Sequence, residues 1–192
     1  MQISSLPADI IRACWLLFSV IWLLAAASTK RSIYRESGAQ RLRYWILLVL
    51  AFLLLTRASR LPYPFNVRII PATETVGWMA GILCIAGLLF CLWARAALGR
   101  NWSGTITLKE GHELIERGPY RLVRHPIYTG LLVMFLATAI KFGYLSGIVA
   151  MLLAFVSFWI KLSDEEKLML QQFPDQYRSY QERVKCIIPF VL

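Results

Sequence analysis

The sequence predicts an all-α integral membrane protein of one domain, residues 1–192, with about five transmembrane helices. Of its 192 residues, 58% are hydrophobic, and the mean hydropathy is +0.56, well above that expected of a soluble domain. Several apolar runs approach the roughly 20 residues that a helix needs to cross a bilayer. Lysines and arginines gather between these runs, as they do in the loops of membrane proteins.

The N-terminal half contains three of the expected helices. The first covers residues 10–28. The second is the weakest, because only residues 44–56 are free of charge and such a short run is compatible with a buried helix as well as with a span. The third covers residues 76–93. It carries Gly77 and Gly81 at a GxxxG spacing, which permits close helix packing and which we expect to be used within the chain.

A polar segment, residues 95–125, separates the third helix from the fourth. Its alternating β-branched residues predict a short hairpin around residues 109–112. The fourth and fifth helices are expected at residues 126–141 and 142–160, and the short KFGY junction between them predicts a tight helical hairpin. The tail that follows is amphipathic, with a break at Pro174.

Loop charges predict the orientation of these helices. With five spans, one side of the membrane carries Lys30, Arg31, Arg35, Arg41, Arg43, Arg95, Arg100, Lys109, Arg117, Arg121, Arg124, Lys161, Lys167, Arg178, Arg183 and Lys185. The other side carries Arg57, Arg60, Arg68 and Lys141. Because basic residues collect in cytoplasmic loops, the C-terminus and the polar segment are expected to be cytoplasmic. Membrane topology therefore accounts for the net charge of +10 better than nucleic-acid binding does.

The stretch ERGPYRLVRHPIYTG, residues 116–130, places polar side chains at the start of the fourth helix. Pro126 suits the first helical position, because its missing N–H would have no partner there. A helix N-terminus attracts anions, and Arg121, Arg124 and His125 add positive charge. The stretch is therefore a candidate anion site, although a basic anchor on lipid phosphates would have the same composition.

The segment KLSDEEKL places Asp164, Glu165 and Glu166 just beyond the fifth helix. These acids could equally form the solvated start of a helix. Because the fourth and fifth helices form a hairpin, however, Glu165 is expected to lie near His125. A ligand with both an anionic and a cationic group, such as an amino-acid headgroup, would fit between them.

Several common catalytic and binding motifs are missing from the sequence. It contains no P-loop, GxSxG, HExxH or GxGxxG pattern. The two histidines, His112 and His125, lack a convincing third ligand, so no metal site is expected. The four cysteines form no CxxC pair, which argues against a zinc site or a disulfide framework.

Residues 95–192 resemble the isoprenylcysteine carboxyl methyltransferase family, within a broader group that includes phospholipid and other small membrane methyltransferases. The resemblance is carried by R-H-P-x-Y-x-G, a helical hairpin, the paired glutamates of EEKLMLQQ, F-x-x-x-Y-x-x-Y and a late I-P. It implies that residues 95–192 form the cofactor-binding catalytic half, whereas residues 1–94 match only as membrane helices. It also implies S-adenosylmethionine as cofactor, S-adenosylhomocysteine as product, and a cytoplasmic site formed by the loop, the hairpin and the tail.

The resemblance further implies which residues form the site. The implied cofactor contacts are Thr105, His112, Glu113, Leu114, Ile115, Tyr120, His125, Pro126, Ile127, Tyr128 and Glu165. Lys161 stands where the family often has an arginine near the carboxylate of the prenyl substrate. Lysine keeps the positive charge but lacks the planar bidentate geometry of arginine.

The chemistry of the acceptor distinguishes the possible functions. The carboxylate of a prenylcysteine-like lipophilic substrate is already an anion at neutral pH, so its methylation needs no general base. A phospholipid amine or a small thiol would have to lose a proton, and a Glu or His would then act as base. A non-enzymatic lipid-binding membrane protein is a further alternative, although the polar residue in mid-span that would mark it is scarce here. The oligomeric state stays open.

Overall fold

The computed structural model describes residues 6–26, 32–99, 102, 107–109, 114–189 and 191, and these form a helical membrane protein. The α-helices are α1 (Leu6–Ala26), α2 (Gly38–Thr56), α3 (Glu74–Leu98), α4 (Pro126–Phe142), α5 (Ser146–Gln172) and α6 (Pro174–Arg183). The short elements are β1 (Ser32–Arg35), η1 (Ala58–Arg60), β2 (Thr107–Lys109) and η3 (Gly118–Arg121). Helices α1, α2, α3 and α5 are long and apolar enough to cross a membrane, and α4 is shorter, with 17 residues.

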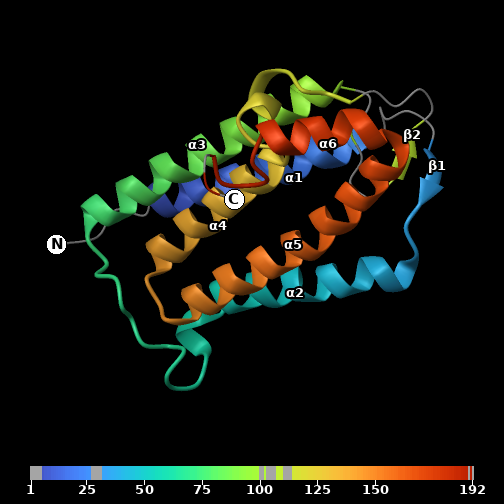
Figure 1. Cartoon of the computed structure of the whole chain (residues 1–192). Helices are drawn as coiled ribbons and strands as arrows, with labels where there is room; N and C mark the ends of the chain where they lie inside the picture. Colours follow the sequence, from blue (N-terminus) through green and yellow to red (C-terminus); the bar gives the residue numbers. More distant parts are fainter. Residues whose placement is uncertain are drawn as a thin grey trace.

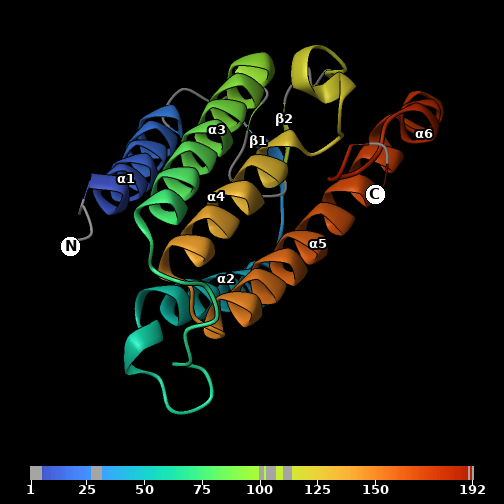
Figure 2. The same ribbon diagram turned by 90° about the vertical axis from the view of Figure 1, so that its left-hand side faces the viewer.

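The long helices form a bundle whose two ends differ. Helices α1, α3 and α4 lie in succession, followed by α5, and α2 packs along α5 (Figure 1, Figure 2). The connection between α2 and α3 lies at one end of the bundle, together with the turn between α4 and α5 (Figure 2). Helices η3 and α6 lie at the opposite end, where α1 and α3 end and α2 begins. This second end contains the candidate site.

Two pairs of glycines bring helices close together. Gly77 and Gly81 of α3 face α1, where a Cβ atom on Gly81 would lie 3.7 Å from Ile10. This confirms that the GxxxG spacing is used within the chain. A closer contact joins α3 to α4: a Cβ atom on Gly130 would lie 2.7 Å from the carbonyl oxygen of Gly87. The final glycine of the R-H-P-x-Y-x-G pattern is therefore required by backbone packing.

Helix α2 begins at Gly38, well before the start predicted from the apolar run. Ser37 caps it: its side chain accepts a hydrogen bond from the amide of Gln40 at 3.2 Å, and the Gln40 side chain accepts one from the amide of Ser37 at 2.9 Å. This reciprocal capping box satisfies two amides that would otherwise lack partners. It extends the helix to 19 residues, which is long enough to span.

Helix α5 differs from the prediction at both ends. It begins at Ser146 rather than at residue 142, because Gly143 ends α4 with a φ of +70° and its carbonyl accepts hydrogen bonds from the amides of Ile69 and Ile70. It then continues through the acidic segment to Gln172, because these residues are good helix formers and nothing interrupts them. The predicted break is confirmed at Pro174, where α6 begins.

The hairpin predicted around residues 109–112 falls mostly on residues 110–113, which lie outside the described part of the chain. Within the described residues, strand β2 pairs antiparallel with β1, with Tyr34 opposite Leu108. Alternating β-branched residues favour an extended strand but do not specify its partner, so this pairing is not predicted from the sequence. The pairing ties the connection between α1 and α2 to the polar segment.

Candidate active site

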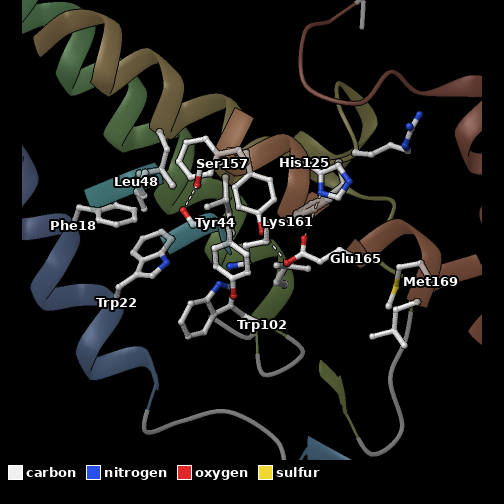
Figure 3. Close-up of a pocket in the computed structure, with 18 of the residues that line it drawn as sticks. Phe18, Trp22, Tyr44, Leu48, Trp102, His125, Ser157, Lys161, Glu165 and Met169 are labelled. Carbon is white, nitrogen blue, oxygen red and sulfur yellow. Dashed lines mark hydrogen bonds and ion pairs between the residues drawn. The ribbon is translucent and has the colours of Figure 1, made fainter. Parts of the chain in front are cut away.

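A cavity of about 490 Å³ opens among α1, α2, α4, α5 and α6. It has an aromatic side and a polar side: Figure 3 shows Phe18, Trp22 and Leu48 on one side of Tyr44, and His125 and Glu165 on the other. Its volume lies in the usual range for small-molecule sites, and a mostly apolar wall with a few convergent polar groups is typical of them.

His125 lies at the polar side of the cavity, immediately before the first residue of α4. Two carboxylates flank its ring: Nε2 lies 3.1 Å from Oε1 of Glu166, and Nδ1 lies 3.7 Å from Oε2 of Glu165. The ring also stacks on Tyr128, with the centroids 5.6 Å apart. The hairpin of α4 and α5 thus brings His125 and Glu165 together, as the sequence predicts.

Glu165 is held toward the cavity by Tyr128. The Tyr128 hydroxyl donates a hydrogen bond to Oε1 of Glu165 at 2.7 Å, and the Tyr128 side chain is buried. The carboxylate keeps its second oxygen near His125. A half-buried carboxylate at this position is suited to pair with a cationic group of a ligand.

Lys161 lies one helical turn before Glu165 on the same face of α5. Its ammonium nitrogen lies 5.4 Å from the ring centroid of Tyr44 and 5.6 Å from that of Tyr128. Both distances are within the range of a cation–π interaction. Lys161 therefore contributes a positive charge to the cavity wall, between the aromatic and polar sides (Figure 3).

Glu166 is a central polar residue that sequence reasoning did not assign to the site. Its Oε1 accepts a hydrogen bond from Nε of Arg124 at 2.8 Å, and its Oε2 accepts one from the Gln181 side chain, also at 2.8 Å. Burial lowers the pKa of Arg124, but the hydrogen bond and charge of Glu166 raise it, and the net shift is upward. The guanidinium is therefore held firmly in its charged form.

The last residues of the chain pack against the start of α4. The amide of Arg124 donates to the carbonyl of Lys185 at 2.8 Å, and the amide of His125 donates to that of Cys186 at 3.0 Å. The Thr129 hydroxyl donates to the carbonyl of Ile187 at 2.6 Å. The C-terminal segment thus fixes the backbone that carries His125, and the I-P of the sequence pattern lies in this segment.

Cys186 and His125 belong to a group that resembles a set of metal ligands. Burial first, and then the charge of Glu166, raise the pKa of the Cys186 thiol to about 12, so this thiol stays protonated and is a poor nucleophile. The ligand atoms of His125, Glu166 and Cys186 lie within 4.8 Å of one another. The sequence alone does not indicate Glu166 and Cys186 as partners of His125, because both lie far from it along the chain. The guanidinium of Arg124 already contacts Glu166, however, and would repel a second cation.

The cavity brings together most of the residues that the family resemblance implies. Leu114, Ile115, Tyr120, His125, Ile127, Tyr128, Lys161 and Glu165 line it. Pro126 is buried at the start of α4, outside the lining set. Thr105, His112 and Glu113 lie outside the described residues. The lining residues that sequence reasoning missed include Trp15, Phe18, Trp22, Tyr44, Leu48 and Phe52 of α1 and α2. In an apolar helix, aromatic residues that face a cavity are indistinguishable by type from those that face lipid.

The chain is similar in sequence to known methyltransferases. The family model described as phospholipid methyltransferase matches residues 76–176. Protein-S-isoprenylcysteine O-methyltransferase A of Arabidopsis thaliana is 29% identical over 139 residues, which cover 69% of this chain and 71% of that protein. Methanethiol S-methyltransferase 1 of Bradyrhizobium diazoefficiens is 35% identical over 71 residues, which cover 37% of this chain and 24% of that protein.

A solved structure has the same fold. The eukaryotic intramembrane Ras methyltransferase, isoprenylcysteine carboxyl methyltransferase, matches with a TM-score of 0.63 and 21% sequence identity. The match covers 92% of this chain but 63% of that one. A probable protein-S-isoprenylcysteine O-methyltransferase of Oryza sativa subsp. indica is 29% identical over 119 residues, which cover 60% of this chain and 62% of that protein. The chain therefore spans slightly less than two thirds of these proteins.

Proposed function

Because the chain belongs to the phospholipid methyltransferase family, we propose that it transfers a methyl group from S-adenosylmethionine to the carboxylate of a prenylcysteine-like lipophilic acceptor. One observation carries this proposal: a single cavity has a polar side with His125 and Glu165, an aromatic side from α1 and α2, and Lys161 between them. Such a cavity suits a water-soluble cofactor at one side and a lipid-soluble acceptor at the other.

The residues at the polar side fit the charges of the cofactor. Glu165 is suited to the amino group, and the amides in the first turn of α4 favour a carboxylate. Leu114, Ile115 and Tyr120 supply the apolar wall of this part of the cavity. When bound, S-adenosylmethionine supplies an electrophilic methyl group on a positive sulfur. Residues 95–192 are accordingly the proposed cofactor-binding half.

The charges in the wall favour a carboxylate acceptor over an amine. The Lys161 ammonium would attract a carboxylate and repel a cationic headgroup. The carboxylate is ionised at neutral pH, so the residues need only orient it and exclude water, and no base has to be assigned. A thiol acceptor would instead need His125 or Glu165 to take up its proton.

The proposed reaction is tested with purified protein and methyl-labelled S-adenosylmethionine. An S-farnesylcysteine, a phosphatidylethanolamine and a small thiol are offered as separate acceptors. We expect label in the farnesylcysteine product, in a form that alkali releases as methanol, because a carboxyl ester hydrolyses in base. Label found in the lipid amine or the thiol, and not in the farnesylcysteine, would contradict the proposed acceptor.

His125→Ala and Glu165→Ala are expected to weaken the binding of S-adenosylhomocysteine. Each removes a group that is suited to a charge-assisted contact, whose loss costs about 1.5–3 kcal/mol, or roughly 10- to 150-fold in affinity. Isothermal titration measures the affinity, and thermal unfolding reports any loss of fold. Glu182→Ala, at an exposed position of α6, is the matched control and should leave the affinity unchanged. Wild-type affinity in both site variants would contradict a role of His125 and Glu165 in cofactor binding and would favour a role in anchoring the protein to lipid.

The proposed topology places the active site and the C-terminus in the cytoplasm, with the N-terminus outside. Ala39 and Asn66 are exposed near opposite ends of α2, and the native cysteines are buried, so single cysteines at these two positions should be labelled selectively. We expect an impermeant maleimide added to intact cells to label Asn66→Cys and not Ala39→Cys. Labelling of Ala39→Cys alone would show that the orientation is the reverse of the proposed one. Equal labelling of both would show that α2 does not cross the membrane.

A further inference from the structure

Glu36 and Tyr44, two residues of the N-terminal half, are joined by a hydrogen bond, and Tyr44 lines the cavity beside Lys161. The Tyr44 hydroxyl donates a hydrogen bond to Oε1 of Glu36 at 2.5 Å, and both side chains are buried. Nε of Arg41 lies 3.6 Å from the same Glu36 oxygen. Because a buried carboxylate is stable only with such partners, this contact fixes the position of the Tyr44 phenol group.

The backbone of Tyr44 is fixed to α5 by a second hydrogen bond. The Ser157 hydroxyl, which is buried, donates to the Tyr44 carbonyl at 2.7 Å. Ser157 lies one helical turn before Lys161 on the same face of α5. The ring of Tyr44 is therefore held at both its hydroxyl end and its backbone end, and its position relative to the Lys161 backbone is set.

Tyr44 and Tyr128 present matching environments to the Lys161 ammonium. Each ring lies within 6 Å of the nitrogen, and each hydroxyl donates to a carboxylate, Glu36 for Tyr44 and Glu165 for Tyr128. Donation to a carboxylate places extra negative charge beside the phenol and strengthens its attraction for a cation. A lysine side chain has many rotamers, and contact with two rings reduces their number.

We propose that Tyr44, oriented by Glu36, is a positioning residue that holds the Lys161 ammonium where it meets the carboxylate of the acceptor. This inference rests on the proposed function and adds a contribution of α2 to acceptor recognition. Tyr44 acts through Lys161, so it affects acceptor binding rather than cofactor binding. Without its ring, the ammonium samples more rotamers and a smaller fraction of them is competent to bind the acceptor.

Kinetics of three variants test the positioning role. Tyr44→Leu removes the ring and should raise KM for S-farnesylcysteine by about 5- to 30-fold, the range between an exposed and a desolvated cation–π contact, with S-adenosylhomocysteine affinity unchanged. Tyr44→Phe keeps the ring but loses the Glu36 contact, so it should have a smaller effect. Phe90→Leu removes a ring from α3 outside the cavity and is the matched control, with unchanged KM expected.

A double-mutant cycle separates positioning from a structural effect. In a Lys161→Met background, Tyr44→Leu should add little to the rise in KM, because the group that it positions is gone. Fully additive effects would overturn the positioning role. A rise in KM that is matched by an equal loss of cofactor affinity would also overturn it, because it would indicate a general distortion of the cavity.

A spectroscopic measurement tests the contact without an acceptor. Lysines are reductively methylated with ¹³C, and the Lys161 signal is assigned from its disappearance in Lys161→Arg. We expect this signal to be shifted by the two tyrosine rings and to move toward the free-lysine position in Tyr44→Leu. An identical signal in wild type and Tyr44→Leu would overturn the inference whatever the acceptor is. A moved signal without turnover of any carboxylate would overturn the proposed function, and with it the acceptor role of Tyr44.

Discussion

Replacing Lys161 with methionine is expected to abolish most turnover of a carboxylate acceptor while S-adenosylhomocysteine affinity stays nearly unchanged. Methionine keeps a flexible unbranched side chain, shorter by the terminal amino group, and removes the positive charge from the wall of the cavity. The loss of a charge-assisted contact of about 1.5–3 kcal/mol corresponds to a fall in kcat/KM of roughly 10- to 150-fold. Steady-state kinetics with S-farnesylcysteine and titration with S-adenosylhomocysteine measure the two quantities on the same preparations.

Two further lysine variants make this result specific. Lys161→Arg keeps the charge and supplies a planar donor, so it should retain or improve turnover. Lys167→Met removes an exposed lysine of α5 that pairs with Asp164, and it should leave turnover unchanged. Wild-type turnover in Lys161→Met would contradict a role of Lys161 in acceptor binding. It would show that the side chain only extends its ammonium group toward the membrane surface, as lysines at such boundaries commonly do.

Glu166→Ala is expected to lower the stability of the end of the protein that contains η3 and α6 by several kcal/mol. The substitution leaves the largely buried guanidinium of Arg124 without its carboxylate, and breaking a buried ion pair in this way costs about 3–5 kcal/mol. It also removes the acceptor for the Gln181 side chain. Thermal unfolding measures the loss, and limited proteolysis reports release of the C-terminal segment that packs beside Arg124.

The matched double variant distinguishes a pair from two independent contacts. Arg124→Met combined with Glu166→Leu removes both charges and should be less destabilising than Glu166→Ala alone, because no uncompensated charge remains. Glu116→Ala breaks the more exposed ion pair with Arg183 and should change stability by about 1 kcal/mol or less. If Glu166→Ala unfolds at the same temperature as Glu116→Ala, the Arg124–Glu166 pair does not hold the tail.

The sequence predicts the membrane helices well because their signal is local. Apolar runs and the short junction at Gly143 specify the hairpin of α4 and α5, and this hairpin is sufficient to predict that His125 and Glu165 meet. The apolar run alone predicts too late a start for α2, because the helix continues through charged residues back to the Ser37 capping signal. That capping signal is also local and is present in the sequence.

The missed features depend on contacts between distant segments. Strand β2 pairs with a segment far away in the sequence, and an isolated β pattern does not encode its partner. Glu166 has the sequence pattern of a solvated residue at a helix start, because its partners, Arg124 and Gln181, belong to other elements. The same holds for Tyr44: its type is common in membrane helices, and only the packing of α2 against α5 places it in the cavity wall.

Because α5 is a single unbroken helix, the thickness of the host membrane should affect the depth at which the proposed acceptor site lies. At about 1.5 Å per residue, the 27 residues of this helix measure about 40 Å, which exceeds a hydrocarbon core of about 30 Å. Lys161 lies only about 22 Å from the start of α5, measured along the helix axis. A thicker bilayer would therefore draw Lys161 deeper below the lipid headgroups, or tilt the helix, and a thinner one would raise it toward water. Reconstitution into lipids of graded chain length should accordingly change acceptor KM more than cofactor affinity.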